Sequence, residues 1–168
     1  RNVYAPFGRA IRARRSELYF ELHFGAVYNA RGEYAWSRDA DEIRRTAEWE
    51  LEAIGTDYAD FGFLHCVDEP EDLAALERGG TLALMQAWQK DGRLHHLGFS
   101  THTPAMANRL LDTGLMDLML FSVNPAYDIE QGDEWGLGTQ LERRNLMERC
   151  QREGVGITVM KPFFGGKR

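Results

Sequence analysis

The sequence lacks the features that mark several classes of protein. It holds only two cysteines, Cys66 and Cys150, and no C-x-x-C pair, so no disulfide framework is expected and a cytoplasmic location is predicted. No apolar run approaches the roughly 20 residues of a membrane helix, so we expect no membrane partner. Lysine and arginine are scattered along a chain of net charge −6, a pattern that argues against nucleic acid as a partner.

What the chain does contain is a regular alternation of strand-forming and helix-forming segments. Strands are predicted at 18–24, 61–67, 94–100, 118–123 and 155–161. Helices are predicted at 6–14, from the capping pair Asp39 and Glu42 to Gly55, from 68–72 to Gly79, and at 81–90, 104–111 and 139–153, with long loops at 25–36 and 124–138. None of the strands alternates polar and apolar residues, as expected when both faces of a sheet are covered.

This alternation predicts a parallel α/β sheet with right-handed crossovers. A complete (β/α)8 TIM barrel takes about 250 residues, and the chain has 168. The prediction is therefore a single partial domain over 1–168, an incomplete barrel of about five strands. A five-stranded doubly wound sheet is the alternative.

Polar residues follow each of the predicted strands. They are His23, His65, Ser100 with His102, Asn124, and Lys161. The carboxyl ends of barrel strands meet at one mouth, so these residues are candidates for a shared site. His95 and His96 begin their strand and are interpreted as structural.

His65 is the strongest single candidate, because a neutral imidazole can donate a hydrogen bond to a carbonyl oxygen that gains negative charge. The alternative is a histidine that bonds backbone groups in the interior. Glu21 and His23 share one strand face if no bulge intervenes, which predicts either a proton relay or a structural ion pair. Cys66 is interpreted as a buried, inert thiol.

Lys161 and the tail after it are less specific. Lys161 either reaches an anion at the mouth or extends to water. Gly165 and Gly166 with Lys167 and Arg168 could approach a phosphate through the backbone, or form a flexible tail.

Five segments together resemble the aldo-keto reductase family: GRAIRARRSELYF, GTDYADFGFLH, GRLHHLGFSTHTP, DLMLFSVNPAYD and GVGITVMKPFFGG. The likeness spans nearly the whole chain, and LYFELHFG and ITVMKPFFGG are similar to the branch that often carries a C-terminal iron–sulfur segment. The resemblance favours the barrel and implies its third to seventh strands. It also implies an oxidoreductase that uses NADP or NAD on a small carbonyl substrate, with any iron–sulfur cluster outside this chain.

The resemblance also assigns roles to single residues. His65 matches the catalytic histidine of the family, and His23 stands where the family has its catalytic lysine. The family's Asp and Tyr would fall before Arg1. Ser100 matches a serine that contacts the nicotinamide amide, Thr101 stands where many members have Asn, and Asn124 matches an Asn after the sixth strand.

Two other functions stay open at this point. A metal-dependent barrel hydrolase would use His23, His65 and His102 as three imidazole ligands. A non-catalytic relative, kept as a binding or scaffold domain, would explain why His23 replaces the lysine. Oligomeric state is left open by the sequence.

Overall fold

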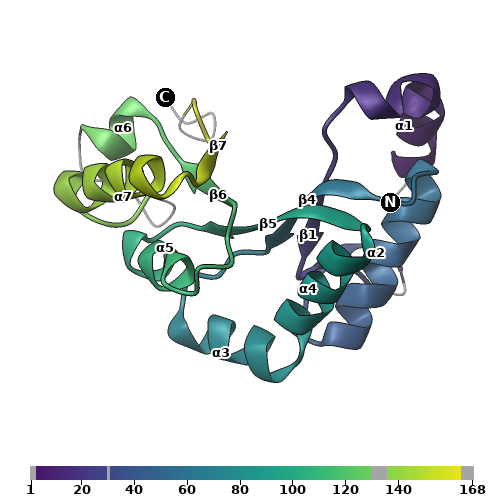
Figure 1. Cartoon of the computed structure of the whole chain (residues 1–168), viewed down its shortest axis with the longest axis horizontal. Helices are drawn as coiled ribbons and strands as arrows, with labels where there is room; N and C mark the ends of the chain where they lie inside the picture. The colour runs from purple at the N-terminus through teal and green to yellow at the C-terminus, as the bar shows by residue number, and fades with distance from the viewer. Residues whose placement is uncertain (1–2, 30, 130–135, 164–168) are drawn as a thin grey trace. The chain divides into compact units, whose positions relative to one another are not determined.

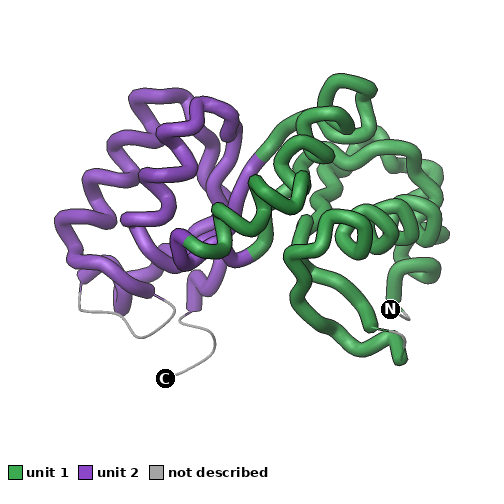
Figure 2. Tube along the Cα trace, turned by 90° about the horizontal axis from the view of Figure 1, so that it is seen from below, with its two compact units in different colours: residues 1–65, 71–97 green, residues 66–70, 98–168 purple. Residues whose placement is uncertain are grey.

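The computed structural model describes residues 3–29, 31–129 and 136–163. They divide into two compact units, shown in different colours in Figure 2. Unit 1 comprises residues 1–65 and 71–97, and unit 2 comprises residues 66–70 and 98–168. The main sheet has five strands in the order β1-β4-β5-β6-β7. Strand β5 (Leu94–Thr101) belongs to unit 1 up to Leu97 and to unit 2 from Gly98.

Unit 1 carries the first strands and the helices that cover them (Figure 1). Its elements are α1 (Tyr4–Ile11), the 3-10 helix η1 (Arg12–Glu17), β1 (Glu21–Phe24), β2 (Ala26–Tyr28), β3 (Tyr34–Trp36), α2 (Ala40–Ile54), β4 (Ala59–Leu64), most of α3 (Pro70–Arg78), and α4 (Thr81–Asp91). The 3-10 helix ends at Glu17, and β1 begins at Glu21, three residues after the predicted start at Leu18. The expected loop after Phe24 contains the antiparallel pair β2 and β3.

Capping residues in the sequence lie at the observed ends of two helices, α2 and α7 (Gln140–Glu153). The Asp39 side chain accepts a hydrogen bond from the Glu42 backbone N–H at the start of α2. Gly55 ends that helix with φ 79°, a left-handed conformation that glycine adopts without a Cβ clash. In unit 2, Thr139 and Glu142 form a full capping box.

Unit 2 continues the alternation after β5. It contains α5 (Pro104–Leu111), β6 (Leu118–Ser122), the short α6 (Pro125–Asp128), α7 (Gln140–Glu153) and β7 (Gly156–Met160). Strand β6 pairs in parallel with β7 in the register Leu118↔Gly156 to Ser122↔Met160. In its described residues, the predicted loop at 124–138 contains the short helix α6. Among the residues that the structure describes, no helix is long and apolar enough to cross a membrane.

The side chains of β1 alternate between a buried face and the opposite face. Leu22 and Phe24 of β1 are buried, and Phe24 meets the ring of Trp88 on α4 edge-on, with centroids 5.6 Å apart. Glu21 and His23 alternate with them and therefore lie on the opposite face of β1. The unbroken register of β1 with β4, Glu21↔Phe61 to Phe24↔Leu64, shows no bulge in this pair.

Candidate active site

His23 and His65, hereafter the imidazole pair, lie together in unit 1. Their Nδ1 atoms are 3.1 Å apart, and the His23 ring also stacks on Phe63 with centroids 5.6 Å apart. Parallel pairing of β1 with β4 produces this contact, because both rings follow the same face at neighbouring strand ends. The predicted proximity of the two histidines is confirmed, while their chemical roles stay predictions.

Glu21 completes the row on that face of β1. One carboxylate oxygen, Oε1, lies 3.4 Å from His23 Nε2, and the Glu21 side chain is 43% exposed. Glu21 is therefore not a buried carboxylate that needs compensation. The arrangement places an acceptor at the outer end of the imidazole pair.

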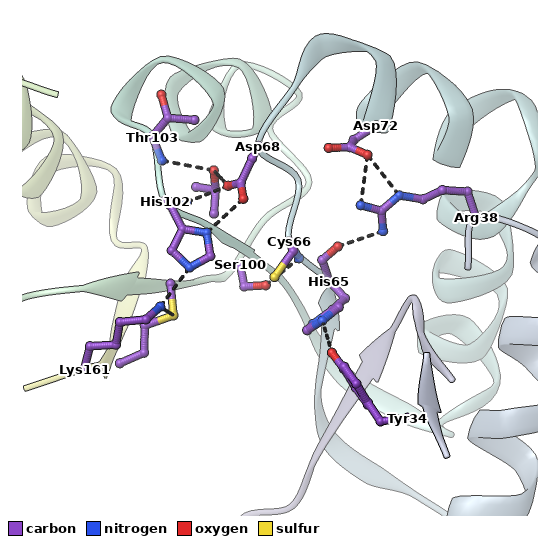
Figure 3. Close-up of polar contacts among 12 residues, drawn as sticks. Tyr34, Arg38, His65, Cys66, Asp68, Asp72, Ser100, His102, Thr103 and Lys161 are labelled. Atoms are coloured by element: carbon purple, nitrogen blue, oxygen red, sulfur yellow. Dashed lines mark hydrogen bonds and ion pairs between the residues drawn. The ribbon is translucent and has the colours of Figure 1, made fainter. Parts of the chain in front are cut away.

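Tyr34 and Trp36 of β3 are site residues that sequence analysis missed. The Tyr34 hydroxyl lies 2.7 Å from His65 Nε2 (Figure 3). Trp36 Nε1 donates a hydrogen bond of 2.7 Å to the same hydroxyl oxygen. The signal was present, since aromatic residues two apart are typical of one face of a short strand, but the segment was assigned to a loop.

Arg38 holds the backbone that carries His65. Its guanidinium donates to the His65 carbonyl oxygen at 2.8 Å and to Asp72 Oδ1 at 3.2 and 3.0 Å (Figure 3). A planar guanidinium that binds two acceptors fixes both in position. His65 is therefore anchored at its main chain and at both ring nitrogens.

The imidazole pair lines a small open pocket of about 280 Å³. Its lining residues are Tyr4, Glu21, His23, Ala26, Tyr28, Tyr34, Glu50 and His65. Glu50 is only 6% exposed and accepts a hydrogen bond of 2.6 Å from the Tyr4 hydroxyl. Burial raises the pKa of Glu50, and burial together with the bond to Glu50 raises the pKa of Tyr4.

Unit 2 holds a second polar group, hereafter the Asp68 cluster, made of Asp68, Thr101, His102 and Lys161. Figure 3 shows Asp68, His102 and Lys161 side by side. The Asp68 carboxylate accepts from Thr101 Oγ1 at 2.9 Å, from the His102 backbone N–H at 2.7 Å and from His102 Nδ1 at 2.8 Å. Burial alone would raise the pKa of Asp68, but the hydrogen bonds from His102 and Thr101 outweigh it and lower that pKa.

Lys161 closes this cluster from the end of β7. Its Nζ atom lies 2.9 Å from His102 Nε2, and its backbone adopts φ 53°, which is uncommon for a residue other than glycine. Asn124 Nδ2 donates to the Lys161 carbonyl oxygen at 3.0 Å. The structure brings three of the predicted strand-end residues together: His102, Asn124 and Lys161.

The residues predicted to hold a nicotinamide amide are polar and firmly placed. Ser100 Oγ accepts from the Cys66 backbone N–H at 2.8 Å, and Asn124 Oδ1 accepts from the Tyr127 backbone N–H at 3.1 Å. The buried Ser122 Oγ has no hydrogen-bond partner among the described residues. An orphaned hydroxyl two residues before Asn124 suits a ligand amide, so these side chains fit the cofactor group. Thr101 directs its hydroxyl to Asp68.

The remaining candidates lie elsewhere or outside the described residues. His95 stacks on Tyr58 with centroids 4.8 Å apart and is exposed at the start of β5. Gly165, Gly166, Lys167 and Arg168 lie outside the described residues. In the part of the chain that the structure describes, no group of three or more His, Cys, Asp or Glu residues could hold a metal ion. The three-histidine metal site is therefore not supported.

Several solved aldo-keto reductases match this chain over most of its length. A structure from Pseudomonas aeruginosa, assigned as an aldo-keto reductase, matches with a TM-score of 0.72 and 20% identity. The match covers 94% of this chain and 55% of that one. An aldo-keto reductase from Bacillus halodurans, in its holo form, matches at 0.62 and 18%, over 93% and 47%. One from the silkworm, Bombyx mori, in complex with NADPH, matches at 0.64 and 18%, over 95% and 46%.

The chain thus spans about half the length of these structures, and its five-stranded parallel sheet with intervening helices is the matching part of their TIM-barrel fold. A search of curated proteins found no match. The model of the aldo/keto reductase family matches residues 6–168, which covers nearly the whole chain, and the chain belongs to this family of oxidoreductases.

Proposed function

We propose that this chain is part of an NAD(P)H-dependent oxidoreductase that delivers hydride to a small carbonyl substrate. His65 and His23 are the proposed catalytic residues, and Ser100, Thr101, Asn124 and Lys161 are the proposed cofactor-binding residues. Family membership supports the reaction class, and the silkworm neighbour, which shares the fold, is described in complex with NADPH. The single partial-barrel domain over 1–168 and the cytoplasmic location stay predictions.

The observation that carries the proposal is the 3.1 Å contact within the imidazole pair. His23, at the position of the family's lysine, contacts His65, the residue proposed to act on the carbonyl. Histidine as a residue type is only partly charged near neutral pH. Glu21 Oε1 lies 3.4 Å from His23 Nε2 and can accept the hydrogen that this nitrogen carries.

The nicotinamide group supplies the hydride when it is bound. The chain's own contribution is to hold that group by buried hydroxyl and amide side chains. Ser100 is 2% exposed and Asn124 5% exposed, so both offer preorganised partners that lose little conformational freedom on binding. Ser122 adds a hydroxyl to the set. An iron–sulfur segment outside this chain stays a prediction.

A non-catalytic scaffold is the competing function, because His23 replaces the lysine. The test is the full-length protein titrated with NADPH and assayed with 4-nitrobenzaldehyde by loss of absorbance at the NADPH band. We expect NADPH fluorescence to change, and His65→Ala to lower kcat/KM by about 100-fold or more, the range for a lost proton-transfer group. No binding at millimolar NADPH, or full activity without His65, would count against the proposal.

The matched control is His95→Ala in the same unit. His95 is exposed and lies at the opposite end of its strand from Ser100 and Thr101, so its removal should leave kcat/KM within about twofold, as for surface changes away from a site. An equal loss in both variants would indicate general destabilisation and not a role at the carbonyl.

A further inference from the structure

The pocket of the imidazole pair combines aromatic rings with carboxylates. Three of its lining residues are tyrosines, Tyr4, Tyr28 and Tyr34, and two are glutamates, Glu21 and Glu50. Among the described residues that line it, none is lysine or arginine. A cavity of this composition attracts positive charge, because carboxylates and the faces of aromatic rings both present negative charge to a ligand.

Glu50 is the buried carboxylate of this pocket. It is only 6% exposed, and its Oε1 atom accepts the hydrogen bond from the Tyr4 hydroxyl. The second oxygen, Oε2, has no hydrogen-bond partner among the described residues. Burial raises the pKa of Glu50, as expected for a carboxylate that loses more solvation than its contacts replace. A cation that enters the pocket would supply the missing compensation.

Tyr4 and Tyr28 form an aromatic corner beside Glu50. Their ring planes are inclined at 84° and their centroids are 6.0 Å apart. Trp49 packs edge-on against both rings, with centroid distances of 5.2 Å to Tyr4 and 5.7 Å to Tyr28, so the angle between the two tyrosines is fixed by a third ring. Aromatic rings at wide angles to each other are the arrangement that binds quaternary ammonium groups.

The imidazole pair lines the same cavity as this corner. His65, the residue proposed to act on the carbonyl, and Glu50 both border it, so one ligand can present its carbonyl to His65 and a cationic group to Glu50. The cavity of about 280 Å³ is small beside the roughly 300–1,000 Å³ of sites for drug-sized ligands. The carbonyl and the cationic group must therefore be separated by few bonds.

We propose that this pocket binds the cationic group of its substrate, and that the substrate is a small aldehyde or ketone with an alkylammonium group close to the carbonyl. Tyr4, Tyr28 and Glu50 bind the cation, and Glu21, whose side chain is 43% exposed, adds a weaker, solvent-screened attraction. The inference rests on the proposed function and deepens it, because it names the substrate class of that reaction. Binding of the cation does not require the nicotinamide group, so the two can be tested apart.

The first test measures binding without reaction. Choline and 3,3-dimethylbutan-1-ol have the same shape and differ in charge, because a quaternary nitrogen replaces a quaternary carbon. The full-length protein is titrated with each by calorimetry at about pH 8, where carboxyl groups as a class are ionised and imidazoles as a class are neutral. We expect a dissociation constant about tenfold or more lower for choline. Equal dissociation constants, or no binding of choline, would overturn the inference.

Glu50→Gln and its control Glu52→Gln assign this preference to the pocket. Glu50→Gln removes the carboxylate and keeps an acceptor for Tyr4, and it should reduce the preference for choline about tenfold. Glu52 is exposed on the same helix, so its variant changes the net charge equally and should retain the wild-type preference. An equal reduction in both variants would indicate a long-range effect of net charge and would contradict the assignment.

Tyr28→Leu tests the aromatic part independently of the carboxylate. Loss of the ring should reduce the preference for choline about fivefold, the equivalent of one cation–π contact. Tyr19→Leu is the control, because Tyr19 is 84% exposed and is not among the lining residues. Circular dichroism and thermal unfolding check that the variants are folded. An unchanged preference in both Tyr28→Leu and Glu50→Gln places the cation elsewhere and overturns the inference.

The second test uses the corresponding aldehydes, betaine aldehyde and 3,3-dimethylbutanal, as substrates with NADPH. The ratio of their kcat/KM values is compared between variants, because the intrinsic reactivity of each aldehyde cancels in that comparison. Relative to the wild type, Glu50→Gln should lower the ratio of the cationic to the neutral substrate about tenfold, and Glu52→Gln should leave it unchanged.

The outcomes separate this inference from the proposed function. If both aldehydes are reduced with the same ratio in the wild type and in Glu50→Gln, the reduction stands and the inference is overturned. If choline binds with the expected preference but the protein neither binds NADPH nor reduces an aldehyde, the cation site stands. The proposed function then fails, and the assignment of the substrate class fails with it.

Discussion

The imidazole pair and the Asp68 cluster are both built on histidines at strand ends, yet their hydrogen bonding differs in kind. In the Asp68 cluster the carboxylate requires hydrogen on His102 Nδ1, so Nε2 is an acceptor for the Lys161 ammonium. The His102 side chain is only 4% exposed. In the imidazole pair the two Nδ1 atoms lie 3.1 Å apart, and which of them donates depends on the tautomers of the two rings.

The difference shows how the same residue type serves two purposes. A buried histidine whose ring is fixed by a carboxylate has one favoured proton arrangement and contributes to the positions of its neighbours. A partly exposed histidine that contacts a second imidazole can place its ring hydrogen on either nitrogen. Both tautomers allow a similar number of hydrogen bonds. The Asp68 cluster is therefore expected to matter for stability, and the imidazole pair for proton transfer.

The largest effect that separates the two regions should come from Asp68→Ala. This change leaves the His102 backbone N–H and Nδ1–H without their acceptor in a buried place, and we expect the free energy of unfolding to fall by about 3 kcal/mol. His23→Ala removes a partly exposed ring and should cost less than about 1 kcal/mol. Urea unfolding of the full-length protein measures both.

Asp57→Ala is the control, because Asp57 is exposed before β4 and its loss should change the free energy of unfolding by less than about 0.5 kcal/mol. Equal losses for Asp68→Ala and His23→Ala would remove the distinction between a structural cluster and a proton-transfer pair.

Local patterns explain why the strands and several strand-end residues were predictable. Apolar runs that end in a polar residue indicate buried parallel strands. This pattern was sufficient to predict that His65, Asn124 and Lys161 lie at strand ends. Alternation along β1 placed His23 and Glu21 on one face. Each of these inferences depends only on residues that are close in sequence.

The residues that were missed depend on pairings between distant segments. Tyr34 joins the site only because β3 pairs with β2 and brings the ring to His65, which is 31 residues away. Asp68 lies in a loop and acquires partners 33 and 34 residues away. Cys66 and Lys161 adopt a left-handed backbone conformation. Neither residue is glycine, so the residue type did not indicate this conformation, which the surrounding structure has to maintain.

An intermediate effect should appear when Asp68→Asn is followed through acid. Because its pKa is lowered in the folded state, the Asp68 charge stabilises the protein above the ordinary carboxyl pKa of about 3.9, and this contribution is lost as pH falls through the lowered value. At pH 7 the free energy of unfolding of the wild type should exceed that of Asp68→Asn by about 1.5–3 kcal/mol, the contribution of a charged hydrogen bond. This difference, hereafter the gap, should narrow below about pH 4.

Unfolding in urea at a series of pH values measures this gap, with Asp57→Asn as the control of equal charge change. A gap that is constant from neutral to acid pH would mean that the Asp68 charge adds nothing to the cluster.

The smallest effect, and one of opposite sign, is expected at Glu50 beside the imidazole pair. Burial raises the pKa of Glu50 despite the hydrogen bond from Tyr4, so ionising this carboxyl in the folded state costs free energy. The cost is absent well below the ordinary value of about 4.3 and grows as pH rises through the raised one. Relative to the wild type, Glu50→Gln should therefore gain stability as pH rises.

We expect the gain to reach about 1 kcal/mol, because glutamine keeps the acceptor for Tyr4 without a charge to desolvate. Glu52→Gln, exposed on the same helix, changes the net charge equally and controls for long-range effects. Opposite pH slopes for Glu50→Gln and Asp68→Asn, measured by the same urea series, would establish that charge is tolerated poorly beside the imidazole pair and required in the Asp68 cluster. Slopes of the same sign would contradict this difference, because ionisation of Glu50 and of Asp68 would then affect the free energy of unfolding in the same direction.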